Sequence, residues 1–188
     1  ITSALDLDEV LQNTVDLLHS SFGYYHVAVY TPDEISGDAI MRSRAGAFAS
    51  LFPPDHRLRA GQGMVGWVFE NKRTLLANDV NSEPSYVNFY PDRIPSRSEL
   101  TVPIWIRGIL AGALDLQSPL LDAFVPDDVH IIETVATQLA VAIANARLYA
   151  QAQERLVEKQ QVEDLLRMQR DMLAAVGQAE NFQVALAG

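Results

Sequence analysis

The sequence contains no cysteine. This absence excludes disulfide bonds, thiolate metal sites, thiol catalysis and covalently attached bilin chromophores. The chain also has no run near the roughly 18 unbroken apolar residues of a membrane span, so we expect no membrane segment in this fragment. It opens at Ile1 without an initiator methionine and without a signal-peptide pattern. We therefore expect an internal piece of a longer, cytoplasmic protein.

Positive charge is scarce as well. The chain has 14 Lys and Arg residues against 24 Asp and Glu residues, which gives a formal net charge of −10. Binding to DNA or RNA depends on clustered basic side chains that displace counterions from the phosphate backbone. The charge balance therefore argues against nucleic acid as a partner.

With 188 residues, 48% of them hydrophobic, the chain is long enough for one compact domain and an appendage. Apolar residues recur every three or four positions over 6–22, which predicts an amphipathic helix. Alternating residues predict strands over 25–30 and 39–45. A loop-rich middle, 46–95, contains a short helix over 63–71 and a short strand over 74–77.

The clearest hairpin lies at 98–117, where two alternating segments flank a turn at Arg107 and Gly108. Pro103 removes a backbone donor from its strand, so we expect an irregularity there. From Pro126 no Gly or Pro follows until Gly177, which predicts one long helix. We divide the chain into a domain at 1–149, a helical coiled-coil extension at 150–176 and a tail at 177–188, where a following module could begin.

The order of these elements and several short sequence motifs resemble those of a GAF domain over roughly 1–149. Five fragments carry the resemblance, and they occur in the expected order: Leu5–Leu11, Gly61–Val68, Asn78–Val80, Ser98–Pro103 and Leu114–Ser118. The resemblance implies an α+β fold related to PAS domains. Its central antiparallel sheet would have five to six strands, helices on one face, a small-molecule pocket beneath the middle loops, and a long C-terminal signalling helix.

Gly61, Gly63 and Gly66 spell G-x-G-x-x-G, the dinucleotide-binding pattern, but that site needs a preceding strand and a parallel βαβ unit. Residues 55–60 are polar and the later strands form a hairpin, so we interpret the glycines as easing a loop into a helix. The four histidines show no metal-ligand spacing. His56 is a conceivable haem ligand, but a solvated loop histidine is the favoured interpretation, and the cofactor stays unknown.

Glu99 and Asp115 would face the interior from the hairpin, where a carboxylate needs a partner or a ligand amine. We expect Asp115 to share its strand face with Ala111 and Ala113, which leave space above it. Alternatively, Glu99 caps a loop and Asp115 binds a buried backbone donor or an arginine. The aromatic residues nearby could line a pocket or form a small core that holds the loops. The candidate ligand-binding residues are Phe52, Met64, Trp67, Tyr86, Phe89, Tyr90, Glu99 and Asp115.

The apolar spacing of the long helix fades over 150–161 and then resumes in a four-three pattern. The candidate dimerisation residues are Val162, Leu166, Gln169, Leu173 and Val176. We therefore expect a homodimer formed through the N- and C-terminal helices, adjoining other signalling domains of the same chain.

The resemblance implies a regulatory module that senses a small molecule and passes its state along the C-terminal helix. The parent protein would be a sensor histidine kinase of a two-component system, a cyclic-dinucleotide enzyme or a transcriptional regulator. The alternative is a scaffold without a ligand that dimerises and spaces its neighbours. The GAF enzymes that reduce free methionine sulfoxide depend on cysteine, and we see no other paired catalytic groups, so we expect that this fragment is not an enzyme.

Overall fold

The computed structural model describes the backbone of residues 7–186 and the side chains of residues 7–172. It divides into two compact units, residues 1–146 and 147–188. The helices and strands are α1 (Leu7–Phe22), β1 (His26–Pro32), β2 (Ala39–Gly46), η1 (Ala49–Leu51), β3 (Arg57–Leu58), α2 (Gly63–Asn71), β4 (Leu75–Ala77), η2 (Val80–Ser82), β5 (Ser98–Ile106), β6 (Ile109–Ser118) and α3 (Pro126–Leu186).

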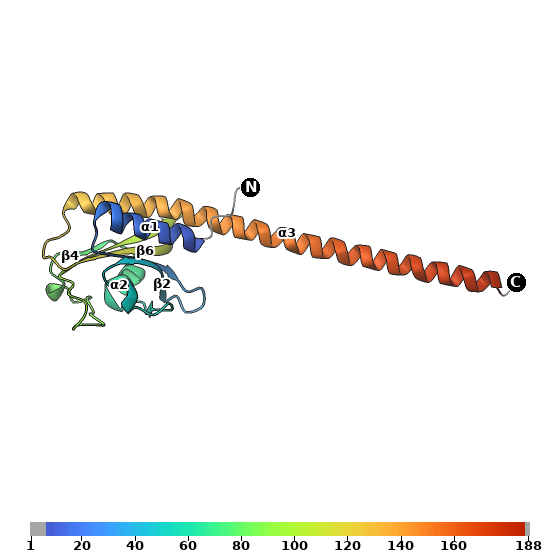
Figure 1. Ribbon diagram of the computed structural model, residues 1–188, viewed down its shortest axis with the longest axis horizontal. Coiled ribbons are helices and arrows are strands. Elements are labelled where there is room, and N and C mark those ends of the chain that lie inside the picture. The colour runs from blue at the N-terminus through green and yellow to red at the C-terminus, as the bar shows by residue number, and fades with distance from the viewer. Residues whose placement is uncertain (1–6, 187–188) are drawn as a thin grey trace. The chain divides into compact units, whose positions relative to one another are not determined.

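Within the described residues the strands form one sheet in the order β3-β2-β1-β6-β5-β4, and all its pairings are antiparallel. In Figure 1, α1 and the first part of α3 cover one face of the sheet, while α2 lies on the other. This arrangement confirms the predicted α+β class and the predicted sheet. It also places the loops of the middle region on the face opposite α1 and α3.

Alternation along the strands sorts side chains between two cores. Val27 and Val29 of β1 pack with Leu11 and Ile132 beneath α1 and α3. Tyr30 of the same strand packs on the opposite side with residues of α2 and the middle loops. The sheet is therefore covered on both faces, and the second face holds the mixture of polar and aromatic residues described below.

Two details of the sheet differ from expectation. The strand β3 lies within 55–60, where the sequence pattern indicated only a polar loop; its Leu58 is buried and pairs with Ala39 of β2. In β5 the register shift falls between Ile104 and Trp105 rather than at Pro103. Pro103 is tolerated because β4 pairs only as far as Thr101, so the outer side of β5 has no neighbouring strand there.

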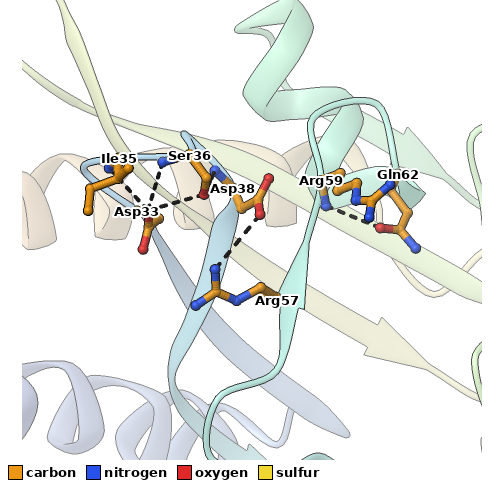
Figure 2. A network of polar contacts seen from close by, with 7 residues as sticks. All are labelled: Asp33, Ile35, Ser36, Asp38, Arg57, Arg59 and Gln62. Atoms are coloured by element: carbon orange, nitrogen blue, oxygen red, sulfur yellow. Dashed lines mark hydrogen bonds and ion pairs between the residues drawn. The ribbon is translucent and has the colours of Figure 1, made fainter.

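Exposed polar contacts fix the turns at one end of the sheet (Figure 2). The Asp33 carboxylate accepts hydrogen bonds from the backbone N–H of Ile35, at 3.0 Å, and from that of Ser36, at 2.8 Å. These two bonds lower the pKa of Asp33 below its ordinary value. Arg57 of β3 forms a 3.9 Å ion pair with Asp38. The contacts close the β1–β2 turn, as an aspartate at such a position commonly does.

One described helix is long and apolar enough to cross a membrane by length and composition: α3 over 126–172, whose most apolar stretch of 18 residues has a mean hydropathy of 1.3. This length and hydropathy are weak evidence for a membrane span, because the core helix of a globular domain can have both. Ile132, Leu139 and Ile143 of this helix are buried in the core that it shares with the sheet.

The three glycines of the G-x-G-x-x-G pattern form the tight entry to α2, as interpreted from the sequence. Gly61 has a φ of +77°, and its N–H donates to the carbonyl of Gly66 at 2.9 Å. A Cβ on Gly66 would lie 2.3 Å from the carbonyl oxygen of Arg59. The pattern therefore serves close backbone packing.

We predict that Gly66→Ala lowers the free energy of unfolding by about 2 kcal/mol or more, because the added methyl must displace backbone. Gly37→Ala is the control, since a Cβ there meets nothing within 4 Å and its φ is +75°; it should lose only about 1 kcal/mol of left-handed strain. Chemical denaturation measures both. Equal losses would contradict the packing explanation.

Candidate functional site

Three polar side chains, those of Glu99, Asp115 and Gln117, line the floor of a cavity on the sheet face opposite α1 and α3, and Thr101 lies beside them. In the β5–β6 pairing, Glu99 lies opposite Gln117 and Thr101 lies opposite Asp115. Because side chains two residues apart share a strand face, all four point to the same side. The outer neighbours of the two acids are small: Ala77 of β4 pairs with Glu99, and Ala28 of β1 pairs with Asp115.

The strand face of Asp115 differs in part from the one expected. Ala113 shares it and packs on the α2 side of the sheet, but Ala111 packs on the other side, beneath α3. The register shift at Ile104 and Trp105 falls opposite this stretch of β6 and changes the alternation. Ala113 and Ala28 therefore supply the space beside Asp115.

Asp115 is held by hydrogen bonds from both of its strand neighbours. The Thr101 hydroxyl donates to Asp115 Oδ1 at 2.6 Å, and Gln117 Nε2 donates to Asp115 Oδ2 at 3.2 Å. The Ser96 hydroxyl in turn donates to Gln117 Oε1 at 2.7 Å. A threonine and a glutamine therefore hydrogen-bond to Asp115 where a buried backbone donor or an arginine was expected.

The two acids form a coupled buried pair. Glu99 is 4% exposed and Asp115 is 1% exposed. Burial, followed by the charge of Asp115, raises the pKa of Glu99 well above its ordinary value. Burial also raises the pKa of Asp115, while hydrogen bonds from Thr101 and Gln117 oppose that increase. The hydrogen bond between the two carboxyl groups also raises the pKa of Glu99 and lowers that of Asp115, so Glu99 takes up a proton before Asp115 does.

Aromatic and apolar side chains from four separate segments enclose the cavity above this floor. Its volume is about 30 Å³, which is room for about two water molecules. No Lys or Arg occurs among the described residues that line it. The lining residues are Tyr30, Phe52, His56, Leu58, Gly63, Met64, Val65, Tyr86, Val87, Asn88, Phe89, Ile94, Glu99, Asp115 and Gln117.

Six of the eight candidate ligand-binding residues line this cavity: Phe52, Met64, Tyr86, Phe89, Glu99 and Asp115. The other two do not. Trp67 and Tyr90 pack against the core beneath α2, and the Tyr90 ring meets the Phe52 ring edge-on at 5.6 Å. Whether the six bind a ligand stays a prediction.

Sequence reasoning missed Tyr30 and Gln117 as cavity residues. Tyr30 belongs to an alternating strand that gave no hint of which face would be polar. Its pKa is raised well above the ordinary value by burial and then by the charges of Asp115 and Glu99. Gln117 stands two residues after Asp115, and that spacing on a strand is the signal that could have identified it.

One wall of the cavity is fixed by an arginine on β2. The Arg44 guanidinium donates to three backbone carbonyls, those of Ala49, Phe52 and Pro53, at 2.6, 2.8 and 3.2 Å. The Phe52 ring then stacks at a tilt on His56, with centroids 4.7 Å apart. The segment that carries Phe52 is therefore tied to the sheet at several points.

The sequence and this geometry can now be compared with known proteins. The GAF domain family model matches residues 4–144. The chain belongs to the GAF domain family. GAF domain-containing protein A of Dictyostelium discoideum is 26% identical over 114 residues, which cover 61% of this chain and 66% of that protein.

Two solved structures place the fold among GAF domains. The GAF domain of a phosphoenolpyruvate-protein phosphotransferase from Coxiella burnetii has a TM-score of 0.71 at 24% identity, with 79% of this chain and 88% of that one covered. The free methionine-R-sulfoxide reductase of Neisseria meningitidis, solved in complex with its substrate, has a TM-score of 0.68 at 26% identity, with 77% and 81% covered. GAF domains are generally regulatory sensing modules.

The second of these structures corrects one expectation. We expected from the sequence that this fragment is not an enzyme, but the reductase is an enzyme with the same GAF fold. The GAF fold can therefore be enzymatic. The absence of cysteine bears on thiol chemistry alone, so the broader expectation was wrong.

The candidate dimerisation residues lie in the second unit of the GAF chain. Val162 and Leu166 are exposed by 56% and 59%, and Gln169 is exposed too. The side chains of Leu173 and Val176 lie outside the described residues. In the first unit, a groove of about 340 Å³ between α1 and α3 is lined in part by Leu17, which is exposed.

A buried histidine lies behind the fixed wall of the cavity. His26 of β1 is 1% exposed, its ring lies 5.0 Å from that of Phe48 and 6.0 Å from that of Phe52, and its Nδ1 has no hydrogen-bond partner. Burial, and next the Arg44 charge, lowers the pKa of His26 from 6.5 to about 4. The ring is therefore neutral in the folded GAF domain.

Since the unfolded chain takes up this proton first, His26 lowers stability as the pH falls from 6.5 toward 4. Between pH 7 and pH 5 the wild type should lose about 2 kcal/mol more free energy of unfolding than His26→Phe does. Phe48→Leu, which disturbs the same rings without removing a proton site, should keep the wild-type pH dependence. Denaturation at both pH values tests this, and parallel losses in wild type and His26→Phe would contradict it.

Proposed function

We propose that this GAF domain is the sensing module of a multidomain signal-transduction protein, and that its ligand is a small molecule with an ammonium group. The observation that carries the proposal is the Glu99–Asp115 pair, a buried negative charge in a cavity whose described lining includes no basic side chain. A buried charge is costly unless it is paired. A ligand ammonium supplies the missing partner.

The surroundings of the pair also suit a cation. Phe52, Tyr86 and Phe89 line the same cavity, and aromatic faces attract cations by several tenths of a kcal/mol to about 2 kcal/mol. The similar reductase acts on free methionine sulfoxide, which is an amino acid. Free amino acids are therefore the first ligand class that we propose.

An amino acid is larger than the two or so water molecules that the cavity holds, so binding requires a wall to move. The movable wall is the segment 83–97, which contributes Tyr86 and Phe89 and leads directly into β5. The Arg97 N–H donates to the Ser118 carbonyl at 2.7 Å. We propose that movement of this segment shifts the balance between two states of the domain, which is the means by which it senses its ligand.

Binding of a ligand is tested by thermal shift with free amino acids, their deaminated acids, cyclic nucleotides, oxo-acids and haem. An amino acid at 100 times its dissociation constant should add about 2.7 kcal/mol of apparent stability, and its deaminated acid should add none. Asp115→Asn should weaken binding by at least about 30-fold, because the ligand charge loses its partner.

Glu70→Gln removes one negative charge from an exposed site on α2 and is the matched control, with affinity expected to stay unchanged. If no amino-bearing compound stabilises the wild type, the proposed ligand class is wrong. If no compound of the screen does, the sensing proposal is wrong and the alternative gains support: a scaffold without a ligand that dimerises and spaces neighbouring domains.

We further propose that the state of the domain passes along α3 through a homodimer, in a cytoplasmic protein such as a sensor histidine kinase of a two-component system. Support comes from the second unit, where every described side chain from 147 to 172 is exposed. A helix with exposed apolar residues in four-three spacing is stabilised when it pairs with a second copy as a coiled coil, because pairing buries those residues.

Val162→Glu combined with Leu166→Glu should convert a dimer to a monomer, because it places four carboxylates in the paired apolar seam. Sedimentation velocity measures the mass. Gln161→Glu combined with Gln160→Glu, which adds the same charge outside that seam, should leave the dimer intact. A dimer that survives the first pair of substitutions would show that this helix does not hold the copies together.

A further inference from the structure

A chain of side-chain hydrogen bonds runs along one edge of the cavity floor to Asp115, which also shares a hydrogen bond with Glu99. Ser96 Oγ donates to Gln117 Oε1 at 2.7 Å, and Gln117 Nε2 donates to Asp115 Oδ2 at 3.2 Å. Thr101 occupies the other oxygen, Asp115 Oδ1, at 2.6 Å. Both oxygens of Asp115 thus accept from neutral donors, an arrangement that stabilises the ionised form.

The direction of the chain is set by Asp115, because an ionised carboxylate can only accept, and the Ser96 hydroxyl donates to the other end of the Gln117 amide. An amide group has one accepting end and one donating end. When the serine hydroxyl donates to Oε1, the NH₂ end of Gln117 must face Asp115. The opposite orientation would place the amide oxygen against the Asp115 carboxylate, two acceptors without a proton between them. Ser96 is 7% exposed, so water cannot readily replace its hydroxyl.

We propose that Ser96 and Gln117 are positioning residues that keep Asp115 ionised beside a protonated Glu99 and thereby fix the cavity at one negative charge. This inference rests on the proposed ammonium-binding function and names the feature that would set its charge selectivity. Without the Gln117 donor, the buried pair would more readily take a second proton and become neutral. With an acid in place of Gln117, the floor would carry three carboxyl groups.

Other titratable and charged groups also face the pair of acids. Tyr30 of β1 and Tyr86 of the 83–97 segment line the cavity with His56, and the charge of Glu83 raises the pKa of Glu99. Tyr86 also shares a side-chain hydrogen bond with Ser96. The hydrogen-bond chain therefore continues into the segment that a ligand must displace.

The test is a ¹³C NMR titration of the side-chain carboxyl groups in the full 188-residue chain without a ligand. In Gln117→Leu, which keeps the shape and removes the donor, the titration midpoint assigned to Asp115 should rise by about one pH unit. Ser96→Ala should raise it by less, because the amide stays but loses its fixed orientation. Gln117→Asn, which keeps an amide on a shorter side chain, should restore part of the effect.

Ser98→Ala is the matched control. Ser98 is also a buried serine on this stretch of chain, but its hydroxyl donates to the Leu120 carbonyl at 2.9 Å, away from the acids. Its loss should leave the Asp115 midpoint unchanged. An unchanged midpoint in Gln117→Leu, or an equal rise in Ser98→Ala and Ser96→Ala, would overturn the inference.

A second measurement separates this inference from the proposed function. Binding of L-methionine is followed by calorimetry between pH 5 and pH 8 in wild type and Gln117→Leu, and the affinity of the variant should begin to fall at a higher pH. If the midpoints shift as expected but L-methionine and the other amino acids do not bind the wild type, the ligand class is wrong and the positioning roles stand. If amino acids bind and the midpoints do not move, the positioning roles are wrong.

Discussion

The pairing of β5 with β6 is the constraint on which the rest of the domain depends. Its register puts Leu100 and Leu116 beneath the helices and, by the same alternation, puts Glu99 and Asp115 on the opposite face. A slip of one residue would exchange the two sets. The apolar core on one side therefore holds the acids in place on the other.

Holding two carboxyl groups in a small, buried cavity opposes folding, because burial penalises the charged form. The domain limits this cost by a hydrogen bond between Glu99 and Asp115 and by surrounding Asp115 with hydrogen-bond donors. His26 is a second polar group kept in an unfavourable environment, with one ring nitrogen unpaired. Such exceptions to ordinary packing concentrate where a protein has a function to perform.

The sequence was sufficient for the longer helices and strands and for the burial of the two acids, because alternation and helical spacing report directly on which face is buried. It was not sufficient for the walls of the cavity. Trp67 lies on the predicted helix but faces the core, while Tyr30 lies on an ordinary strand and faces the cavity. Which aromatic side chain meets the acids depends on how the loops cross the sheet, and no local pattern contains that information. The short strand β3 was missed for the same reason, since its two residues have no periodicity to detect.

The two long segments that wall the cavity are attached to the sheet in different ways. Arg44 ties the segment around Phe52 to β2 through three carbonyls, whereas the side chain of Asn88 forms its hydrogen bonds within 83–97 itself, with Ile94 and Tyr90. One wall is thus anchored to the sheet along its middle, and the other is tied to β6 at its end, through Ser96 and Arg97. With 83–97 as the wall that moves, as proposed above, a ligand would enter past Tyr86 and Phe89 and stop against the anchored wall around Phe52.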